Sequence, residues 1–134
     1  MNEQPKKHLT EKEKEISNNI RSSTMELLLL YSSAEQQREY ANQVGDQTAI
    51  TEMVCMWFDD LYDINSVIFR YAFAHFELLK LEDFNKFFDE VDELIPEDSI
   101  DELLDDSNWK ILMEKASVLH LELTKWNKGT PHKK

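Results

Sequence analysis

The chain has 134 residues, with 27 acidic and 15 basic side chains and a formal net charge of −12. This length is typical of one domain that buries enough apolar surface to fold without a disulfide or a metal. The negative charge disfavours binding to nucleic acid or to an anionic membrane and favours a basic protein as partner. The first residues lack the apolar core of a secretory signal, so we expect a cytoplasmic protein.

Glycine and proline are rare, with two glycines and three prolines in the chain. Hairpins need these residues at their turns, so the composition favours an all-α fold over a sheet. We expect a compact single-domain bundle of about five to six helices over residues 10–126, with flexible ends at 1–9 and 127–134. No repeat of solenoid length occurs, which favours a bundle over an extended array.

The N-terminal part predicts two helices from caps and apolar spacing. Thr10 and Glu13 have the spacing of a capping box, and Ser33 has the same relation to Gln36. The second of these helices should end near Gly45, because glycine commonly terminates helices. The apolar stripe predicted for the first helix is Ile16, Ile20, Leu27, Leu28 and Tyr31.

The central part contains the most regular pattern of the chain. Thr48 is a candidate cap for a helix that runs to about residue 61. Its predicted apolar face consists of Ile50, Met53, Val54, Trp57, Phe58 and Leu61. In residues 63–76 apolar side chains occupy nearly every position, so we expect a turn followed by a short buried helix.

The C-terminal part predicts two long helices with a short one between them. The first should run from about residue 77 to 94 and be stopped by Pro96, and Ser99 with Glu102 should cap the short helix. Either Asp106 or Ser107 caps the last helix. The predicted inner faces are Phe84, Phe87, Phe88, Val91, Leu94 and Ile95 for the first, and Trp109, Leu112, Met113, Ala116, Leu119, Leu123 and Trp126 for the last.

Residues 89–106 contain ten carboxylates and no Lys or Arg. Like charges four residues apart on a helix repel by about 0.2–0.5 kcal/mol per pair, so local stability does not favour this run. It can be a solvated face that maintains solubility or a docking surface for a basic partner. The contact residues that we predict are Asp89, Asp92, Glu93, Glu97, Asp98, Asp101, Glu102, Asp105 and Asp106, with Asp59, Asp60 and Asp63 as a secondary cluster.

Two acidic motifs resemble those of metal-dependent enzymes. The string DDLYD at 59–63 matches the DDxxD motif by which isoprenoid synthases hold magnesium diphosphate, but the chain is too short for that fold and has no second metal motif. ExxE at 90–93 followed by ExxD at 102–105 resembles the signature of all-α nucleotide pyrophosphohydrolases, in which four carboxylates converge on magnesium. That resemblance implies the enzyme alternative, a Mg-dependent nucleotide pyrophosphohydrolase with the ligands Glu90, Glu93, Glu102 and Asp105.

No catalytic nucleophile motif, phosphate-binding glycine loop or zinc-ligand spacing occurs, so we predict no catalytic residue and no cofactor. The segment CMWFDDLYDINSVIFRYAFAHFELLKLEDFNKFF at 55–88 resembles a pattern in small uncharacterised bacterial cytosolic proteins. In size and acidity the chain is also similar to immunity proteins, which cover the cationic site of a toxin with carboxylates. This resemblance implies an immunity or antitoxin-like inhibitor that masks a basic partner protein. A helical export chaperone and a homodimeric scaffold are further alternatives.

Overall fold

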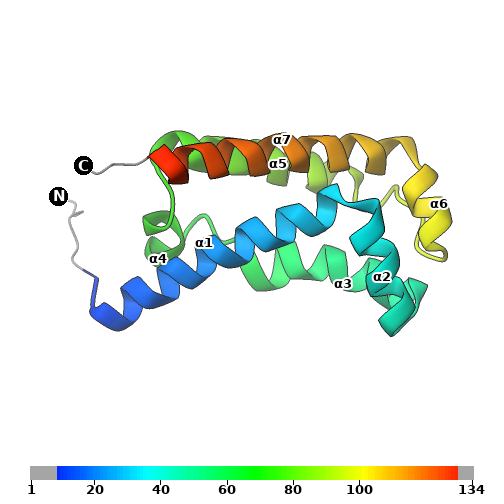
Figure 1. The fold of residues 1–134 in the computed structure, drawn as a ribbon, viewed down its shortest axis with the longest axis horizontal. Coiled ribbons are helices and arrows are strands. Elements are labelled where there is room, and N and C mark those ends of the chain that lie inside the picture. Colours follow the sequence, from blue (N-terminus) through cyan, green and yellow to red (C-terminus); the bar gives the residue numbers. More distant parts are fainter. Residues whose placement is uncertain (1–8, 130–134) are drawn as a thin grey trace.

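The computed structural model describes residues 9–129, with side chains described through residue 125, and this part of the chain contains helices and turns but no strand. The elements are α1 Glu11–Ser32, α2 Ala34–Val44, α3 Asp46–Cys55, the π-helical turn η1 Met56–Leu61, α4 Val67–Tyr71, α5 His75–Val91, α6 Ile100–Asp105 and α7 Ser107–Gly129. Figure 1 shows α1 running between α7 on one side and the α3–η1 segment on the other, with α2 and α6 at one end. The predicted all-α single domain is therefore confirmed.

Local caps place the first three helices. Thr10 and Glu13 form the predicted capping box, with hydrogen bonds of 3.1 and 2.9 Å between each side chain and the other residue's backbone N–H. Ser33 caps α2 as predicted. Gly45 then adopts a φ of +97°, which lets α3 begin at the next residue, so Thr48 lies inside the helix and the prediction that it is the cap is wrong.

The helix that begins with α3 changes its pitch at η1. The Tyr62 N–H donates a 2.9 Å hydrogen bond to the Trp57 carbonyl, which is the five-residue spacing of a π-helical turn. The buried Trp57 indole donates a 2.9 Å hydrogen bond to Asn85 Oδ1 on α5 and thereby anchors the turn. Asp59 and Asp60 remain exposed on the outer side of η1.

Aromatic rings and one buried amide organise the core where α1, α5 and α7 meet. Tyr31 is fully buried, and its hydroxyl donates a 2.5 Å hydrogen bond to the Met53 carbonyl. Gln37 is also fully buried, donates to two carbonyls at the end of α1 and accepts a 2.9 Å hydrogen bond from the Trp109 indole. The rings packed around Tyr31 are Trp57, Phe84, Phe88 and Trp109.

The apolar stripe predicted for α1 is only partly correct. Ile16 is 42% exposed and Ile20 is half-buried, whereas the buried positions include Ser17 and Thr24. Thr24 satisfies its hydroxyl by donating a 2.7 Å hydrogen bond to the Ile20 carbonyl. Because α1 packs along α7 on the stripe with these small residues, the two isoleucines lie at the side of that contact. The predicted burial of Leu27, Leu28 and Tyr31 is confirmed.

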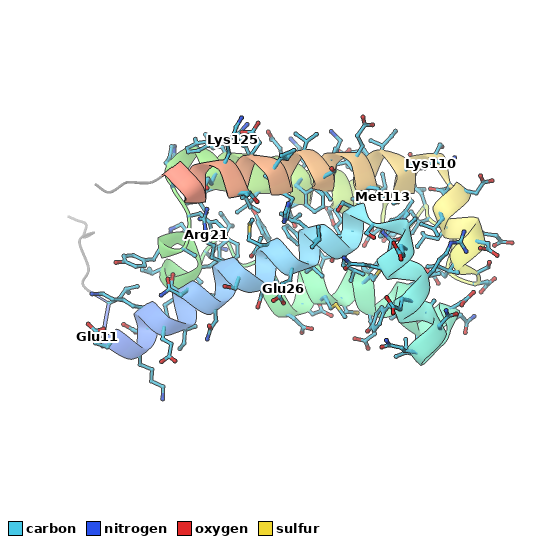
Figure 2. All side chains as sticks on the ribbon, in the orientation of Figure 1. Glu11, Arg21, Glu26, Lys110, Met113 and Lys125 are labelled. Atoms are coloured by element: carbon cyan, nitrogen blue, oxygen red, sulfur yellow. The ribbon has the colours of Figure 1, made fainter. Side chains whose placement is uncertain are left out.

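A buried ion pair that the sequence pattern did not predict fixes the position of α1. The Arg21 guanidinium donates hydrogen bonds of 3.0 and 2.9 Å to the two carboxylate oxygens of Glu77, which is fully buried. Arg21 also donates to the carbonyls of Ala72 at 2.8 Å and Leu123 at 3.2 Å. Figure 2 shows Arg21 on the side of α1 that faces α4 and α7. One side chain therefore ties α1 to the start of α5 and to α7.

The end of α5 differs from the prediction. The helix ends at Val91 rather than at residue 94, and Leu94 is 64% exposed instead of lying on the inner face. The last turn of α5 has no basic side chain, and its acidic residues are unfavourable at the negative end of a helix dipole. Ile95 is buried after the chain has turned, as predicted, and Ser99 caps α6.

The last helix begins at the predicted position and continues to Gly129. Asp106 accepts a 3.0 Å hydrogen bond from the Trp109 N–H, so Asp106 is the cap rather than Ser107. On the predicted inner face of α7, five residues are buried as expected: Trp109, Leu112, Ala116, Leu119 and Leu123. Met113 is half-buried, and Trp126 lies outside the described side chains. The predicted flexible ends are 1–9 and 127–134; of these, residues 1–8 and 130–134 lie outside the described residues, and residues 127–129 belong to α7. Among the helices of residues 9–129, none has the length and apolar character needed to cross a bilayer.

Candidate partner-binding surfaces

The acidic run 89–106 covers the end of the bundle where α5 leads into α6 (Figure 1). Most of the predicted contact residues point outward: Asp89, Glu93, Glu97, Asp98, Asp101, Glu102 and Asp105 are exposed. Asp92 and Asp106 are half-buried. A large part of the run is therefore available to a partner on a preformed helical end.

Part of this run also holds α6 in place. Asp101 forms an ion pair with Arg38 on α2, and Asp98 accepts a 3.0 Å hydrogen bond from Gln47 on α3. Asp106 is occupied as the cap of α7. Some carboxylates of the run therefore stabilise the fold, a role that a surface used only for docking would not need.

Asp92 lies among like charges of the run. Burial raises the pKa of Asp92, and the neighbouring charges of Asp89 and Glu93 raise it further. Among residues 9–125, Asp89, Asp92, Glu93, Glu97 and Glu102 have no ion-pair partner. This end of the molecule therefore presents negative charge that no cation of the described chain neutralises.

The four carboxylates of the enzyme alternative lie on separate elements. Glu90 is in the last turn of α5 and Glu93 follows it, while Glu102 and Asp105 belong to α6, which packs on α2, α3 and α7. Among the described residues, no group of three or more His, Cys, Asp or Glu side chains is arranged to hold a metal. The structure therefore does not bring these four residues together as a ligand set.

A groove of about 480 Å³ lies between α1 and η1. Glu26 and Asp60 are its acidic side chains, and none of the lining residues, all in the described part of the chain, is basic. Figure 2 shows Glu26 on the side of α1 that faces α3. The apolar lining residues are Ile16, Ile20, Leu27, Leu30, Met56 and Leu61.

The predicted secondary cluster borders a second hollow that continues this groove. The second hollow measures about 450 Å³, shares Ile20, Asp60 and Leu61 with the first, and is bordered by Asp59 and Asp63. We call the two hollows together the acid-rimmed groove. Burial raises the pKa of the Cys55 thiol on the preceding helix, and the nearby Asp59 raises it further.

A third hollow, of about 440 Å³, lies between α5 and α7, and we call it the mixed-charge groove. Its rim has both signs, with Lys80 and Lys115 near several carboxylates. The apolar side chains Ile111 and Val118 line it and are largely exposed. The sequence interpretation missed this surface because it followed only the buried stripe of α7, although the spacing of Ile111, Val118 and Leu121 on the opposite face was a usable signal.

In comparisons with protein-family models, with curated proteins and with solved structures, nothing matches the chain. The fold and the surfaces define an all-α single domain with two apolar grooves of different rim charge.

Proposed function

We propose that the chain is an acidic protein-binding module whose acid-rimmed groove receives a basic, amphipathic segment of a partner protein. The observation that carries this proposal is an apolar floor between α1 and η1 bordered by Glu26 and Asp60, continued by a more polar hollow bordered by Asp59 and Asp63, with no basic side chain among the lining residues of either hollow. The module then acts as an immunity or antitoxin-like inhibitor that masks the basic surface of its partner.

The groove suits a helix that has one apolar face. Its α1 stripe extends from Ile16 to Leu30, a span of roughly 20 Å at 1.5 Å per residue. Apolar side chains of the partner would fill the floor and supply most of the contact energy, as in other helix-in-groove complexes. Lys or Arg side chains beside them would meet the carboxylates of the rim, which provide specificity and speed association.

The acidic run 89–106 has a supporting role in this proposal. Its unpaired carboxylates lie at the α5–α6 end, away from the groove floor, and several others stabilise α6. Their field extends over a screening length of about 8 Å at physiological salt and attracts a basic protein before contact. Neutralising the run should therefore slow association more than it speeds dissociation.

A synthetic amphipathic helix with leucine on one face and lysine on the other tests the groove directly. Methyl NMR should show shifts confined to residues such as Ile16, Ile20 and Met56, and the affinity should fall steeply with added salt. Two control peptides replace lysine by glutamate or leucine by serine, and both should bind much more weakly. Shifts outside the groove, or equal binding of the glutamate peptide, would refute the proposal; salt-independent binding would instead indicate a chaperone for apolar segments.

The inhibitory role needs a natural partner. If a secreted protein with a basic C-terminal domain is encoded beside this chain, that domain should be toxic when expressed alone and harmless when expressed with the chain. The triple variant Asp59→Asn, Asp60→Asn and Asp63→Asn should lose this protection while remaining folded. Protection that survives the triple variant would place the masking surface elsewhere.

A further inference from the structure

The outer face of α7 has an apolar seam that the bundle leaves uncovered. Ile111, Val118 and Leu121 are 44%, 56% and 61% exposed. Together with Glu114 and Lys125 they recur at alternating spacings of three and four residues, the heptad spacing on which a second helix packs. Figure 2 shows Lys110 and Lys125 on the side of α7 that faces away from α1.

The charge of this face differs from that of the rest of the molecule. The described chain is strongly acidic, so two copies repel one another over most of their surfaces. Glu114 and Lys125 lie on the outer side of α7, and Lys115 and Glu122 lie on the adjoining flank toward α5, where the Lys115 ammonium is 5.0 Å from the centroid of the Phe87 ring. Approach along α7 therefore brings charges of both signs together, whereas approach over the rest of the surface brings mainly carboxylates together.

We propose that α7 packs antiparallel against α7 of a second copy, about a two-fold axis that passes between Val118 and Leu121. In this register Val118 packs on the partner's Leu121, twice by symmetry. Glu114 then lies opposite the partner's Lys125, and Lys115 lies beside the partner's Glu122. The same contact covers the mixed-charge groove, because Ile111 and Val118 line both surfaces.

The charges select the antiparallel arrangement over the parallel one. In a parallel pair each seam residue faces its own copy, so Glu114 would face the partner's Glu114 and Lys125 the partner's Lys125. Like charges placed opposite one another at an interface are strongly unfavourable. Only the antiparallel register converts all of these positions into pairs of opposite sign, which is why a second copy of this chain is the occupant that the surface fits.

Sedimentation equilibrium of the full chain tests the proposal. The native chain should show a reversible monomer–dimer equilibrium, and Leu121→Glu should raise the dimer dissociation constant by at least about tenfold, or about 1.4 kcal/mol. The matched control is Leu94→Glu, because Leu94 is 64% exposed and lies outside the seam. Circular dichroism checks that both variants are folded. A native chain that stays monomeric at all concentrations, or equal effects of both variants, would overturn the inference.

Charge reversal tests the register. Lys115→Glu and Glu122→Lys should each weaken the dimer, because each places like charges together twice. The double variant should dimerise again, and an equimolar mixture of the two single variants should form a heterodimer. Lys115 and Glu122 are two helical turns apart within one chain, so only contact between copies explains such rescue. Failure of both rescues would rule out this register, whatever the acid-rimmed groove binds.

Discussion

The acid-rimmed groove and the mixed-charge groove have similar floors and different rims. Each principal hollow is open, apolar at its base and of comparable size, about 480 Å³ between α1 and η1 and about 440 Å³ between α5 and α7. The first has only carboxylates as charged lining residues, whereas the second combines Lys80 and Lys115 with carboxylates. Packing of helices produces the hollow in both cases, and the charge of the rim is the property by which we propose different partners for the two grooves.

One buried anchor, the Arg21–Glu77 pair, joins α1, which lines the first groove, to α5 and α7, which line the second, and its removal should have the largest effect. Glu77→Ala leaves the Arg21 guanidinium without its carboxylate at a site where α1, α5 and α7 meet. We expect a loss of about 3–5 kcal/mol in the free energy of unfolding, measured by urea denaturation, together with weaker binding at both grooves.

The control for this anchor replaces both partners by apolar residues. The double variant Arg21→Met, Glu77→Leu should recover much of the lost stability, because no buried charge remains unpaired. A Glu77→Ala variant that loses less than about 1 kcal/mol would show that the pair is not the shared anchor of the two grooves.

The second prediction separates the two grooves. Asn85→Leu removes the acceptor of the Trp57 indole and leaves that buried N–H without a partner, at a cost of about 1–3 kcal/mol. Because Trp57 belongs to η1, affinity for the leucine–lysine peptide should fall while sedimentation still shows the dimer. Asn65→Leu, at an exposed position, is the matched control. If Asn85→Leu weakened both peptide binding and dimerisation, the two grooves would not be independent.

The third prediction concerns the rim itself. The triple variant Asp59→Asn, Asp60→Asn and Asp63→Asn should weaken peptide binding about tenfold at low salt, the sum of several exposed charge pairs. The difference in peptide affinity between the native chain and the triple variant should shrink as salt is added, because screening lowers both affinities toward the same value. Isothermal titration measures the affinities, and the dimer should be unaffected.

A comparison with the acidic run sharpens this result. The variant Asp89→Asn, Glu93→Gln, Glu97→Gln removes the same number of charges from the α5–α6 end. It should lower the association rate, measured by stopped flow, with little change in the dissociation rate. If it weakens binding more than the rim variant does, the run and not the groove is the contact surface.

Local signals in the sequence were enough to place most of the fold. Caps such as Thr10 and Ser33 depend on neighbours a few residues away, and the apolar spacing identified most of the core. The exposure of Ile16 was not predictable, because it depends on how α1 is rotated against α7. The pairing of Arg21 with Glu77 joins residues far apart in the chain, which periodicity cannot detect.

The candidate site was predictable only in part. The clustering of Asp59, Asp60 and Asp63 follows from their closeness in sequence, and the structure places all three at one hollow. The groove beside them was not predictable, because its floor comes from two elements, α1 and η1, that meet only in the folded bundle. The same reason explains why the sequence showed no mixed-charge groove.

The smallest expected effect concerns Asp92, where neither groove is involved. Burial and the charges of Asp89 and Glu93 raise its pKa above the ordinary value of 3.8, so the folded state favours the protonated form. The protonated Asp92 side chain therefore stabilises the folded state at low pH, and this stabilisation is lost as the pH rises through the raised pKa. Asp92→Asn should stabilise the protein at neutral pH by about 0.5 kcal/mol or less, the scale of like-charge repulsion.

This gain should disappear below the unfolded value of 3.8, where the native side chain is protonated in both states. Urea denaturation at neutral and at acidic pH measures the difference, with Glu39→Gln on the exposed side of α2 as the control. A variant that is less stable at neutral pH would mean that the ionised Asp92 makes a favourable contact. The acidic run would then stabilise the fold instead of destabilising it, and its presence would no longer support a role in binding a partner.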